Sequence, residues 1–477
     1  IKNISVIVAD TESGKVRTYI GSQDFFDREA KGEVNGVIAP RSTGSILKPF
    51  LYGLAIDDGL ILPDTMIKDI PTYFGAFSPE NADKKYSGLV SAKEALTRSL
   101  NVPAVLLLNE YGVYDFYNFL KKADLTTLFR NSDEYGLTLV LGGAEANLFE
   151  ITSLYRSLAN YGNFEDLKLI PSDQVKTDNK TLISKGASYL TLNMLRELKR
   201  PDSEYYWQQY ESRFKIAWKT GTSFGNRDAW AVGVNPKWTV GVWVGNFNGE
   251  SNTNLAGATS AGSLMFDIFN YLPKTKKSLW FKEPYQDLEA IEICKETGYR
   301  AGFSCPHKVI ATKPVKSRNL KQCPYHKAIF VSNDGKNEVC SLCWQPGNYK
   351  KESFLFYSPD VIQFMRQRGN IINDIPPHKE SCPSIHSQNQ VKIIYPTDGA
   401  KLFLPKDIGG ITQKLNLKAA HINTDTTIYW YIDDKFIGNT SNFHSKAIDI
   451  TKGNHTLSIV DQNGNKDSCH FSIYLRE

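Results

Sequence analysis

The sequence predicts a multidomain α+β protein, in which an antiparallel sheet flanked by helices is followed by a C-terminal β-sandwich. Strand patterns stand at both ends of a helical middle over residues 1–275. A segment rich in cysteine and proline follows over residues 276–390, and residues 391–477 alternate apolar and polar side chains in short runs. We therefore expect three domains with these boundaries: a layered α+β domain, a cysteine- and proline-rich linker region, and a sandwich.

The first domain is expected to hold an antiparallel sheet and the helices that cover it. Its first two strands join at Ser13-Gly14, a turn sequence between two apolar runs. The predicted strands are Val6–Asp10, Lys15–Ser22, Trp218–Ser223, Asp228–Val234 and Trp238–Asn246. The predicted helices are Ser45–Leu60, Ala92–Leu100, Ala104–Glu110, Tyr114–Lys122, Phe149–Tyr161, Lys185–Leu198 and a closing helix, Ala256–Leu272.

Three short motifs stand in one order inside this domain: Ser45-Ile46-Leu47-Lys48, Ser99-Leu100-Asn101 and Lys219-Thr220-Gly221-Thr222. Each motif alone is a weak signal, since Ser-x-x-Lys recurs at Ser212. Context strengthens the set, because the first motif opens a predicted helix and the second precedes a helix start with a proline in its first turn. Their order is the signature of active-site-serine acyltransferases that open D-alanyl peptides and β-lactams.

The chemistry explains the residue types in the first two motifs. A serine hydroxyl is a poor nucleophile at neutral pH, so Ser45 needs a nearby base, and Lys48 three residues later on a helix shares its face. To act as a base, Lys48 must have its pKa lowered by burial or by a second cation, for which Lys219 is the candidate. Ser99 would carry a proton to the leaving amine, and Asn101 would hold Lys48 and the substrate amide.

The third motif is expected to line the cleft as an edge strand. The hydroxyls of Thr220 and Thr222 would face a substrate carboxylate, and Gly221 between them lets backbone and substrate approach closely. The backbone N–H groups of Ser45 and Thr222 would form the oxyanion site.

Six stretches carry a resemblance to a known family: Arg41–Phe50, Leu141–Glu145, Leu158–Gly162, Ala217–Ser223, Asp228–Gly233 and Val242–Asn246. They resemble the transpeptidase domain of class A penicillin-binding proteins, and the last two point to the 1C-type subgroup. The resemblance is strong over residues 1–275 and weaker in the tail. It implies the penicillin-binding and β-lactamase-like fold and DD-transpeptidation of peptidoglycan, in which Ser45 is acylated by a stem peptide, D-Ala leaves, and an amine of a neighbouring stem resolves the acyl-enzyme.

Members of that class carry a membrane anchor and a glycosyltransferase domain upstream. The resemblance implies a place on the periplasmic side of the bacterial cell envelope, with an inner-membrane anchor in the full-length protein. This chain goes directly from Ile1 into a strand pattern at Ile4–Val8, so we expect neither the anchor nor the glycosyltransferase domain within it. Either the sequence is trimmed, or this is a separate soluble protein. Within this chain, no apolar run approaches the about 20 residues that cross a bilayer. The motifs fit equally a DD-carboxypeptidase or endopeptidase, in which water replaces the amine, and a penicillin-binding scaffold or sensor that has lost turnover.

The expected partners are stem peptides and β-lactams, and the motifs require no cofactor. A formal net charge of +5 is small for 477 residues and gives no argument for a nucleic-acid partner, and we expect none. Glu145 and Glu150 lie where a class A β-lactamase carries its water-activating glutamate, but the sequence around them lacks the lactamase pattern. We interpret both as structural.

Six of the seven cysteines lie in the linker region: Cys294, Cys305, Cys323, Cys340, Cys343 and Cys382. In an extracytoplasmic protein, disulfides would staple a segment that has little core of its own. Alternatively, Cys323-x-x-His326 and Cys340-x-x-Cys343 would together form one zinc site. Reduced structural thiols are the third alternative.

The last domain is predicted to be an immunoglobulin-like sandwich of short strands. The predicted strands are Val391–Tyr395, Leu415–Ala420, Thr427–Ile432, Phe436–Gly438, Ala447–Ile450, Gly453–Asp461 and Ser468–Leu475. No chemistry is expected in it. We interpret it as a binding or spacing module, and the resemblance suggests a cell-envelope protein as its partner.

Overall fold

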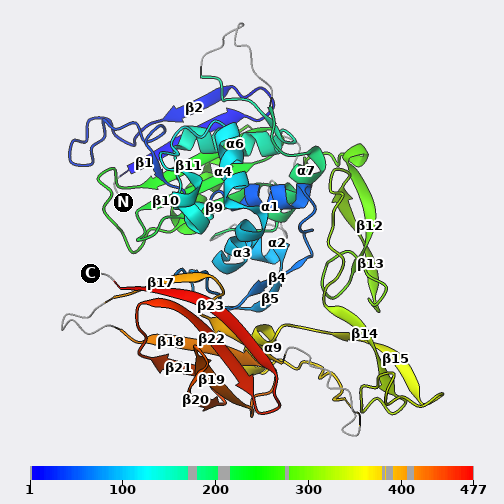
Figure 1. Ribbon diagram of the computed structural model, residues 1–477. Helices are drawn as coiled ribbons and strands as arrows, with labels where there is room; N and C mark the ends of the chain where they lie inside the picture. Colours follow the sequence, from blue (N-terminus) through cyan, green and yellow to red (C-terminus); the bar gives the residue numbers. More distant parts are fainter. Residues whose placement is uncertain are drawn as a thin grey trace. The chain divides into compact units, whose positions relative to one another are not determined.

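The computed structural model describes residues 3–169, 180–201, 215–273, 279–378, 382, 390–405 and 413–475. The chain divides into two compact units (Figure 1). The first comprises residues 1–67, 91–300 and 309–322, and the second comprises residues 68–90, 301–308 and 323–477. Segments of the expected linker region contribute to both units, so the three-domain boundaries stay a prediction. In the described part of the chain, no helix combines the length and apolar character needed to cross a membrane.

A five-stranded antiparallel sheet forms the centre of the first unit. Its strands are β1 (Asn3–Asp10), β2 (Val16–Ile20), β9 (Ala217–Thr222), β10 (Asp228–Val234) and β11 (Trp238–Gly245), in the order β2-β1-β11-β10-β9. β1 pairs with β11 along its full length, from Asn3 opposite Gly245 to Asp10 opposite Trp238. The N-terminal strand thus lies inside the sheet, and β9 forms one edge, as predicted for the strand of the third motif.

Helices cover both faces of this sheet. β10 is buried throughout and apolar after its first residue, Asp228, which is typical of a strand packed on both faces. A Cβ on Gly241 of β11 would collide with α6 (Leu148–Ala159), whereas one on Gly233 of β10 would collide with α8 (Ser263–Tyr271). Gly241 lies opposite Val232, and successive residues of a strand alternate between faces, so α6 and α8 cover opposite faces.

The other α-helices in the described part of the first unit are α1 (Lys48–Asp57), α2 (Ala92–Thr97), α3 (Asn101–Tyr111), α4 (Val113–Lys122), α5 (Ser132–Tyr135) and α7 (Lys185–Arg196). α1 is buried at every position and packs against α2, α3 and α7, which lie beside it in Figure 1. The predicted α+β class is confirmed. The predicted closing helix is divided into a π-helical turn, Gly257–Gly262, and α8.

The cysteine-rich region contains regular structure. Its elements are β12 (Leu288–Cys294), β13 (Lys308–Pro314), β14 (His326–Ser332), β15 (Tyr349–Leu355) and α9 (Pro359–Gln367). β12 pairs with β13, and β14 pairs with β15 from His326 opposite Leu355 to Ser332 opposite Tyr349. β15 reads Tyr-Lys-Lys-Glu-Ser-Phe-Leu, which lacks the apolar alternation that predicts a strand.

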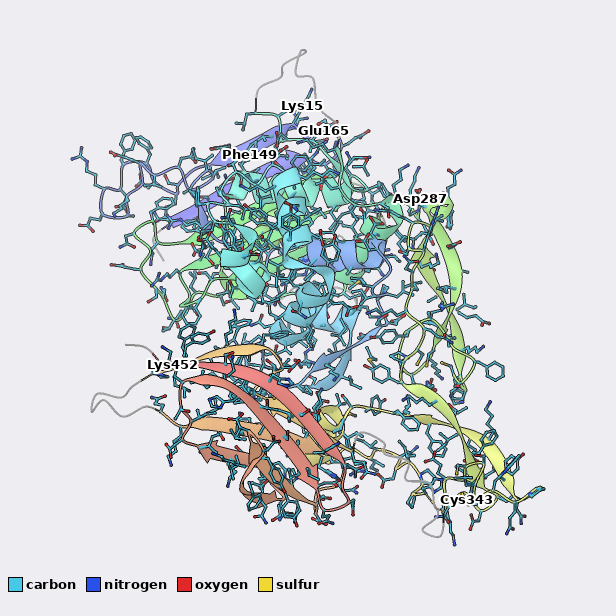
Figure 2. The ribbon with its side chains drawn as sticks, viewed as in Figure 1. Lys15, Phe149, Glu165, Asp287, Cys343 and Lys452 are labelled. Carbon is cyan, nitrogen blue, oxygen red and sulfur yellow. The ribbon has the colours of Figure 1, made fainter. Side chains whose placement is uncertain are left out.

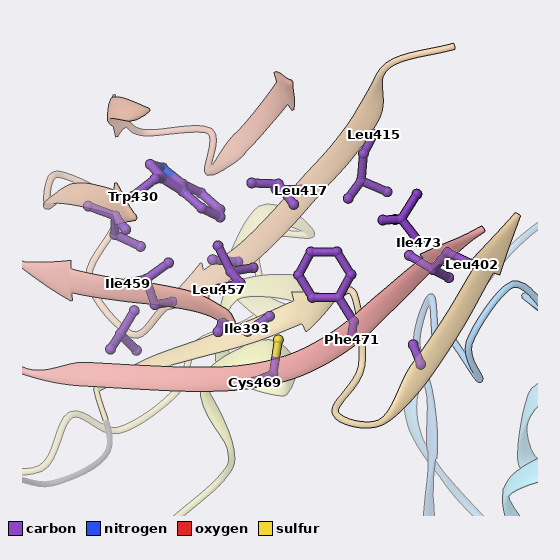
Figure 3. Packing of buried hydrophobic residues seen from close by; sticks show 14 of the residues in the cluster. Ile393, Leu402, Leu415, Leu417, Trp430, Leu457, Ile459, Cys469, Phe471 and Ile473 are labelled. Atoms are coloured by element: carbon purple, nitrogen blue, oxygen red, sulfur yellow. The ribbon is translucent and has the colours of Figure 1, made fainter. Parts of the chain in front are cut away.

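The C-terminal part of the second unit is a β-sandwich. Its strands are β16 (Val391–Tyr395), β17 (Ala400–Leu404), β18 (Leu415–His421), β19 (Thr427–Ile432), β20 (Lys435–Ser441), β21 (Ser445–Ile448), β22 (Gly453–Asp461) and β23 (Lys466–Leu475). They form the sheets β16-β18-β21 and β17-β23-β22-β19-β20. Figure 3 shows the core between them, where Leu417 of one sheet meets Trp430 and Leu457 of the other. The predicted C-terminal β domain is confirmed, with the unpredicted β17 added, and its immunoglobulin-like topology stays a prediction.

Leu417 is fully buried in this core, so Leu417→Ala should leave a cavity and destabilise the sandwich by about 2–5 kcal/mol. Hydrogen exchange in the full chain, followed on peptides from β18 and β22, measures the change. Phe443→Ala is the matched control, because Phe443 is 77% exposed and its loss should change stability by less than about 0.5 kcal/mol. Equal loss of protection in the two variants would contradict the assigned core.

Candidate active site

Ser45 lies in a tight turn just before α1, and the helix predicted to start there begins at Lys48. Pro49 favours that start, because its nitrogen has no hydrogen to leave unpaired in the first turn. Hydrogen bonds from Ile46 N to Thr43 O (3.2 Å) and from Lys48 N to Ser45 O (3.3 Å) give the turn a 3₁₀ form. Because residues i and i+3 are eclipsed in that form, Ser45 and Lys48 still project to the same side.

A second segment holds this turn in place. β3 (Arg41–Ser42) pairs with β6 (Glu145–Ala146), and both the backbone nitrogen and the hydroxyl of Thr43 donate to Ala144 O, each at 3.1 Å. The segment ahead of Ser45 is therefore held twice: strand pairing fixes Arg41–Ser42, and the hydrogen bonds to Ala144 fix Thr43.

Lys48 is completely buried, and three acceptors surround its amine. Its Nζ donates to Ser99 O (2.8 Å), Leu100 O (3.0 Å) and Asn101 Oδ1 (2.7 Å). Burial, and secondarily the nearby charge of Lys219, holds the pKa of Lys48 well below its usual value. The contact with Asn101 is the one expected from the second motif.

Lys219 is also completely buried and reaches the same residue from β9. Its Nζ donates to Ser99 Oγ (2.7 Å) and to Thr220 O (2.9 Å). Burial lowers the pKa of Lys219 to about 7. Two amines with lowered pKa values thus meet at Ser99, one on its carbonyl and one on its hydroxyl.

Ser99 occupies the left-handed backbone region, with φ of +57°. It follows the C-cap of α2: Ser99 N donates to Leu96 O (3.0 Å) and Leu100 N donates to Ala95 O (2.9 Å), the two hydrogen bonds of a Schellman motif. Glycine usually takes this position because a Cβ is disfavoured there. The end of α2 therefore places the carbonyl of Ser99 at Lys48 and its hydroxyl at Lys219. Serine adopts this left-handed backbone conformation only at some cost in free energy.

Two glycines allow β9 to touch the turn that carries Ser45. Gly44 has φ of +52°, and a Cβ there would lie 2.5–2.7 Å from backbone atoms of Thr222. A Cβ on Gly221 would lie 2.5 Å from Thr43 O. A larger residue at either position would force the strand away from the turn. The N–H groups of Ser45 and Thr222, the predicted oxyanion donors, therefore belong to segments in direct contact.

The hydroxyl of Thr222 already has one partner, because Gly257 N donates to Thr222 Oγ1 at 3.0 Å. The hydroxyl accepts in this bond, so its own proton is still available. A carboxylate can only accept hydrogen bonds, so the proton of this hydroxyl is of the kind that a substrate carboxylate needs.

Sequence reasoning missed two buried side chains that fix the turn. The hydroxyl of Tyr155 on α6 donates to Ile46 O at 2.7 Å, and Trp230 Nε1 on β10 donates to Ser42 O at 2.8 Å. Both acceptors are backbone carbonyls whose positions arise only when the domain is folded, so no sequence pattern identifies them.

Glu145 and Glu150 have structural partners, as interpreted from the sequence. Glu145 accepts from Arg130 (2.7 Å) and from the hydroxyl of Tyr135 (3.0 Å). Glu150 accepts from the hydroxyl of Thr126 at 2.5 Å.

The four residues of the predicted zinc site do not form one group, so that prediction is wrong. The structure separates them into a group that includes Cys305, Cys323 and His326 and a group of Cys340, Cys343, His378 and Cys382. No disulfide is formed among the seven cysteines, all of which lie in the described part of the chain.

Two known protein families match this chain, one over its N-terminal part and one over its C-terminal part. The family described as "Penicillin binding protein transpeptidase domain" matches residues 4–270. The chain belongs to the penicillin-binding protein transpeptidase family. A second family, "Penicillin-Binding Protein C-terminus Family", matches residues 383–471.

Two curated relatives and one solved structure are similar to this chain. Penicillin-binding protein 1C of Escherichia coli K12 is 37% identical over 270 residues, which are 57% of this chain and 34% of that protein. Penicillin-binding protein 1F of Bacillus subtilis 168 is 26% identical over 363 residues, with 72% of this chain and 50% of that protein covered. The crystal structure of penicillin-binding protein 1A from Haemophilus influenzae has the same fold, with a TM-score of 0.52 at 18% identity over 66% of this chain and 54% of that chain.

These matches confirm the resemblance to the 1C-type subgroup. The chain spans no more than half the length of the two curated relatives.

The strained position of Ser99 gives a matched pair of variants. Ser99→Gly and Ser99→Ala both remove the hydroxyl that Lys219 contacts, but only glycine relieves the left-handed backbone. We expect the glycine variant to be more stable than the alanine variant by about 1 kcal/mol. Urea unfolding of the two proteins measures the difference, and equal stabilities would contradict the strain.

The pKa of Lys219 predicts a pH-dependent stability. The unfolded lysine titrates near 10.5 and the folded one near about 7, so between these values the unfolded chain binds more protons and stability rises with pH. Lys219→Met should therefore raise the melting temperature at pH 7 and flatten its rise toward pH 9. The exposed Lys185 provides the control, and Lys185→Met should keep the rise of the parent. A Lys219→Met protein with a rise as steep as the parent's would contradict the effect of burial.

Proposed function

We propose that this chain performs the DD-transpeptidase reaction that cross-links peptidoglycan stem peptides, through an acyl-enzyme on Ser45. The observation that supports it most is the meeting of two fully buried lysines, Lys48 and Lys219, at Ser99. Burying amines is costly unless they are paired or neutralised, so packing alone does not account for the arrangement. Serine acylation does, because it needs a base and a path for the proton.

The first half-reaction forms the acyl-enzyme. Ser45 Oγ attacks the carbonyl carbon between the two terminal D-alanines, and its proton passes to Lys48, whose lowered pKa makes it a base. The carbonyl oxygen becomes an oxyanion that the N–H groups of Ser45 and Thr222 stabilise. When the C–N bond breaks, the proton passes through Ser99 to the leaving amine. D-Ala departs and an ester remains on Ser45.

The remaining residues of the third motif bind the substrate. The free carboxylate of the terminal D-Ala faces the hydroxyl of Thr222 and the charge of Lys219, while Gly221 keeps the strand close to the peptide. The second half-reaction is the reverse of the first, with the amine of a neighbouring stem in place of D-Ala. An amine of a neighbouring stem attacks the ester, and Ser45 recovers its proton.

β-Lactams inhibit by the same first step. Attack by Ser45 opens the lactam ring, but the amine that forms stays attached to the acyl group and cannot diffuse away. The ester therefore persists, and the protein is labelled.

This function places the chain at the bacterial cell envelope, on the side that faces peptidoglycan. A membrane anchor in the full-length protein and an envelope protein bound to the sandwich are parts of the same proposal. The match of residues 383–471 to a family named for the C-terminus of penicillin-binding proteins supports a role of the sandwich in this setting.

Mass spectrometry after exposure to penicillin tests the proposal. Penicillin should add its mass once, on the peptide that contains Ser45, and Ser45→Ala should abolish the addition. Lys48→Arg should lower the acylation rate by roughly 10³-fold or more, because arginine stays protonated and cannot be a base. Ser212→Ala changes the other Ser-x-x-Lys of the chain and is the matched control, with labelling unchanged. Labelling at Ser212 would refute the assignment.

A pentapeptide stem then separates the reaction classes. Release of D-Ala that depends on an added acceptor amine, with a cross-linked product, is the expected result. Release at the same rate without acceptor would identify a carboxypeptidase instead, and an acyl-enzyme that never turns over would identify a sensor.

A further inference from the structure

A second cluster of reactive side chains lies in the second unit, in the region predicted to be a linker. The sulfur atoms of Cys340, Cys343 and Cys382 and a ring nitrogen of His378 all lie within 4.8 Å of one another. Figure 2 shows Cys343 beside the end of the β14–β15 hairpin, where the connection between the two strands carries the first two cysteines. We propose that these four residues bind one structural zinc ion.

The distances inside the cluster are those of a tetrahedron around zinc. A tetrahedral site with Zn–S bonds of about 2.3 Å places its sulfur atoms about 3.8 Å apart. Cys340 Sγ lies 3.6 Å from Cys382 Sγ and 3.9 Å from Cys343 Sγ, and Cys343 Sγ lies 3.8 Å from His378 Nε2. Each separation is close to a tetrahedral edge.

None of these three cysteines is in a disulfide, and the two sulfur–sulfur distances given above are far too long for one. A disulfide requires sulfur atoms about 2.05 Å apart, well below 3.6 Å. Three cysteines also cannot all be paired among themselves. A Cys₃His ligand set uses all four side chains and is one of the standard structural zinc sites.

The turn between the first two cysteines is built to hold thiolates. Cys343 N and Trp344 N donate to Cys340 O at 3.0 and 2.9 Å, which closes the turn. Leu342 N donates to Cys340 Sγ at 3.4 Å and Cys340 N donates to Cys343 Sγ at 3.2 Å. Backbone N–H groups aimed at sulfur stabilise its negative charge, which zinc requires of its cysteine ligands.

Backbone pairing brings the histidine to this turn. Glu338 N donates to Pro377 O at 3.0 Å, and Glu338 and His378 form a parallel bridge. Glu338 lies two residues before Cys340, so this bridge holds His378 next to the turn that carries Cys340 and Cys343. Its spacing from Cys382 gives His-x-x-x-Cys, which completes Cys-x-x-Cys in the manner of structural zinc modules.

The β14–β15 hairpin needs stabilisation by a metal ion because few of its apolar side chains are buried. In residues 326–355, all of which the structure describes, the buried apolar side chains are Val331 and Val339. Two valines cannot hold a hairpin of this length, since an isolated two-stranded hairpin is marginal at best in water. Four protein ligands leave no open position for a substrate, so the zinc would stabilise the fold and take no part in acyl transfer. Binding releases the protons of the three thiols without any redox change.

Elemental analysis of the full chain tests the proposal, with the protein purified without a polyhistidine tag and dialysed against zinc-free buffer. Cys343→Ser and His378→Asn should each lose one equivalent of zinc per chain relative to the parent. Cys469→Ser and His470→Asn are the matched controls, because Cys469 lies in the sandwich core and the ring of His470 is exposed, and both should keep the full zinc content. The loss caused by Cys343→Ser should persist when Cys323→Ser is also present, which distinguishes this cluster from the group around Cys323.

A second measurement protects the test against a variant that fails to fold. The parent protein, stripped of metal and reloaded with Co²⁺, should show thiolate-to-cobalt charge-transfer absorption that is reduced in Cys343→Ser. Peptide mapping of the non-reduced, alkylated parent should find no disulfide at Cys340, Cys343 or Cys382. Unchanged zinc in Cys343→Ser, absence of the cobalt band in the parent, or a disulfide at these cysteines would each overturn the proposal.

Discussion

The burial of two lysines around one serine is the constraint on which the first unit depends. Lys48 comes from α1, Ser99 from the junction of α2 and α3, and Lys219 from β9. Water would keep both amines charged, so each element must pack closely enough to exclude it. The complete burial of α1 and the covering of the sheet on both faces therefore keep water away from the amines as well as contributing to stability. A site of this kind cannot be built on a fragment of the domain.

The same constraint explains where the domain is strained. Ser99 holds a left-handed backbone that glycine would adopt more easily, and both lysines lie where their charged forms are disfavoured. All three features lower stability, and strain gathered at one place in this way is typical of functional sites, where stability is traded for activity. The rest of the domain compensates through a large apolar core, of which the continuously buried β10 is one part.

Much of this could be predicted, because the chemistry itself specifies residue types. The order of the motifs selected Ser45, Lys48, Ser99, Asn101 and Lys219, and hydrophobic periodicity located the helices and strands that carry them. The start of α1 was missed because a 3₁₀ turn has the same i, i+3 spacing as a helix. The contacts of Tyr155 and Trp230 were missed because their acceptors are backbone carbonyls. Neither leaves a pattern in the sequence.

The zinc ligands show where spacing alone fails. Cys323-x-x-His326 and Cys340-x-x-Cys343 are each plausible half-sites, and nothing in the sequence says which halves combine. The combination is decided by strand register: β14 and β15 bring the Cys340 turn to the hairpin end, and the Glu338–His378 bridge supplies a histidine from beyond α9. A domain with a large core can bury ionisable side chains such as those of Lys48 and Lys219, whereas a hairpin with two buried valines has no large core to offset such a cost and, under our proposal, takes its stability from metal ligands. Both parts of the chain need a source of stability: the first unit takes it from its apolar core, and the hairpin, under our proposal, takes it from metal ligation.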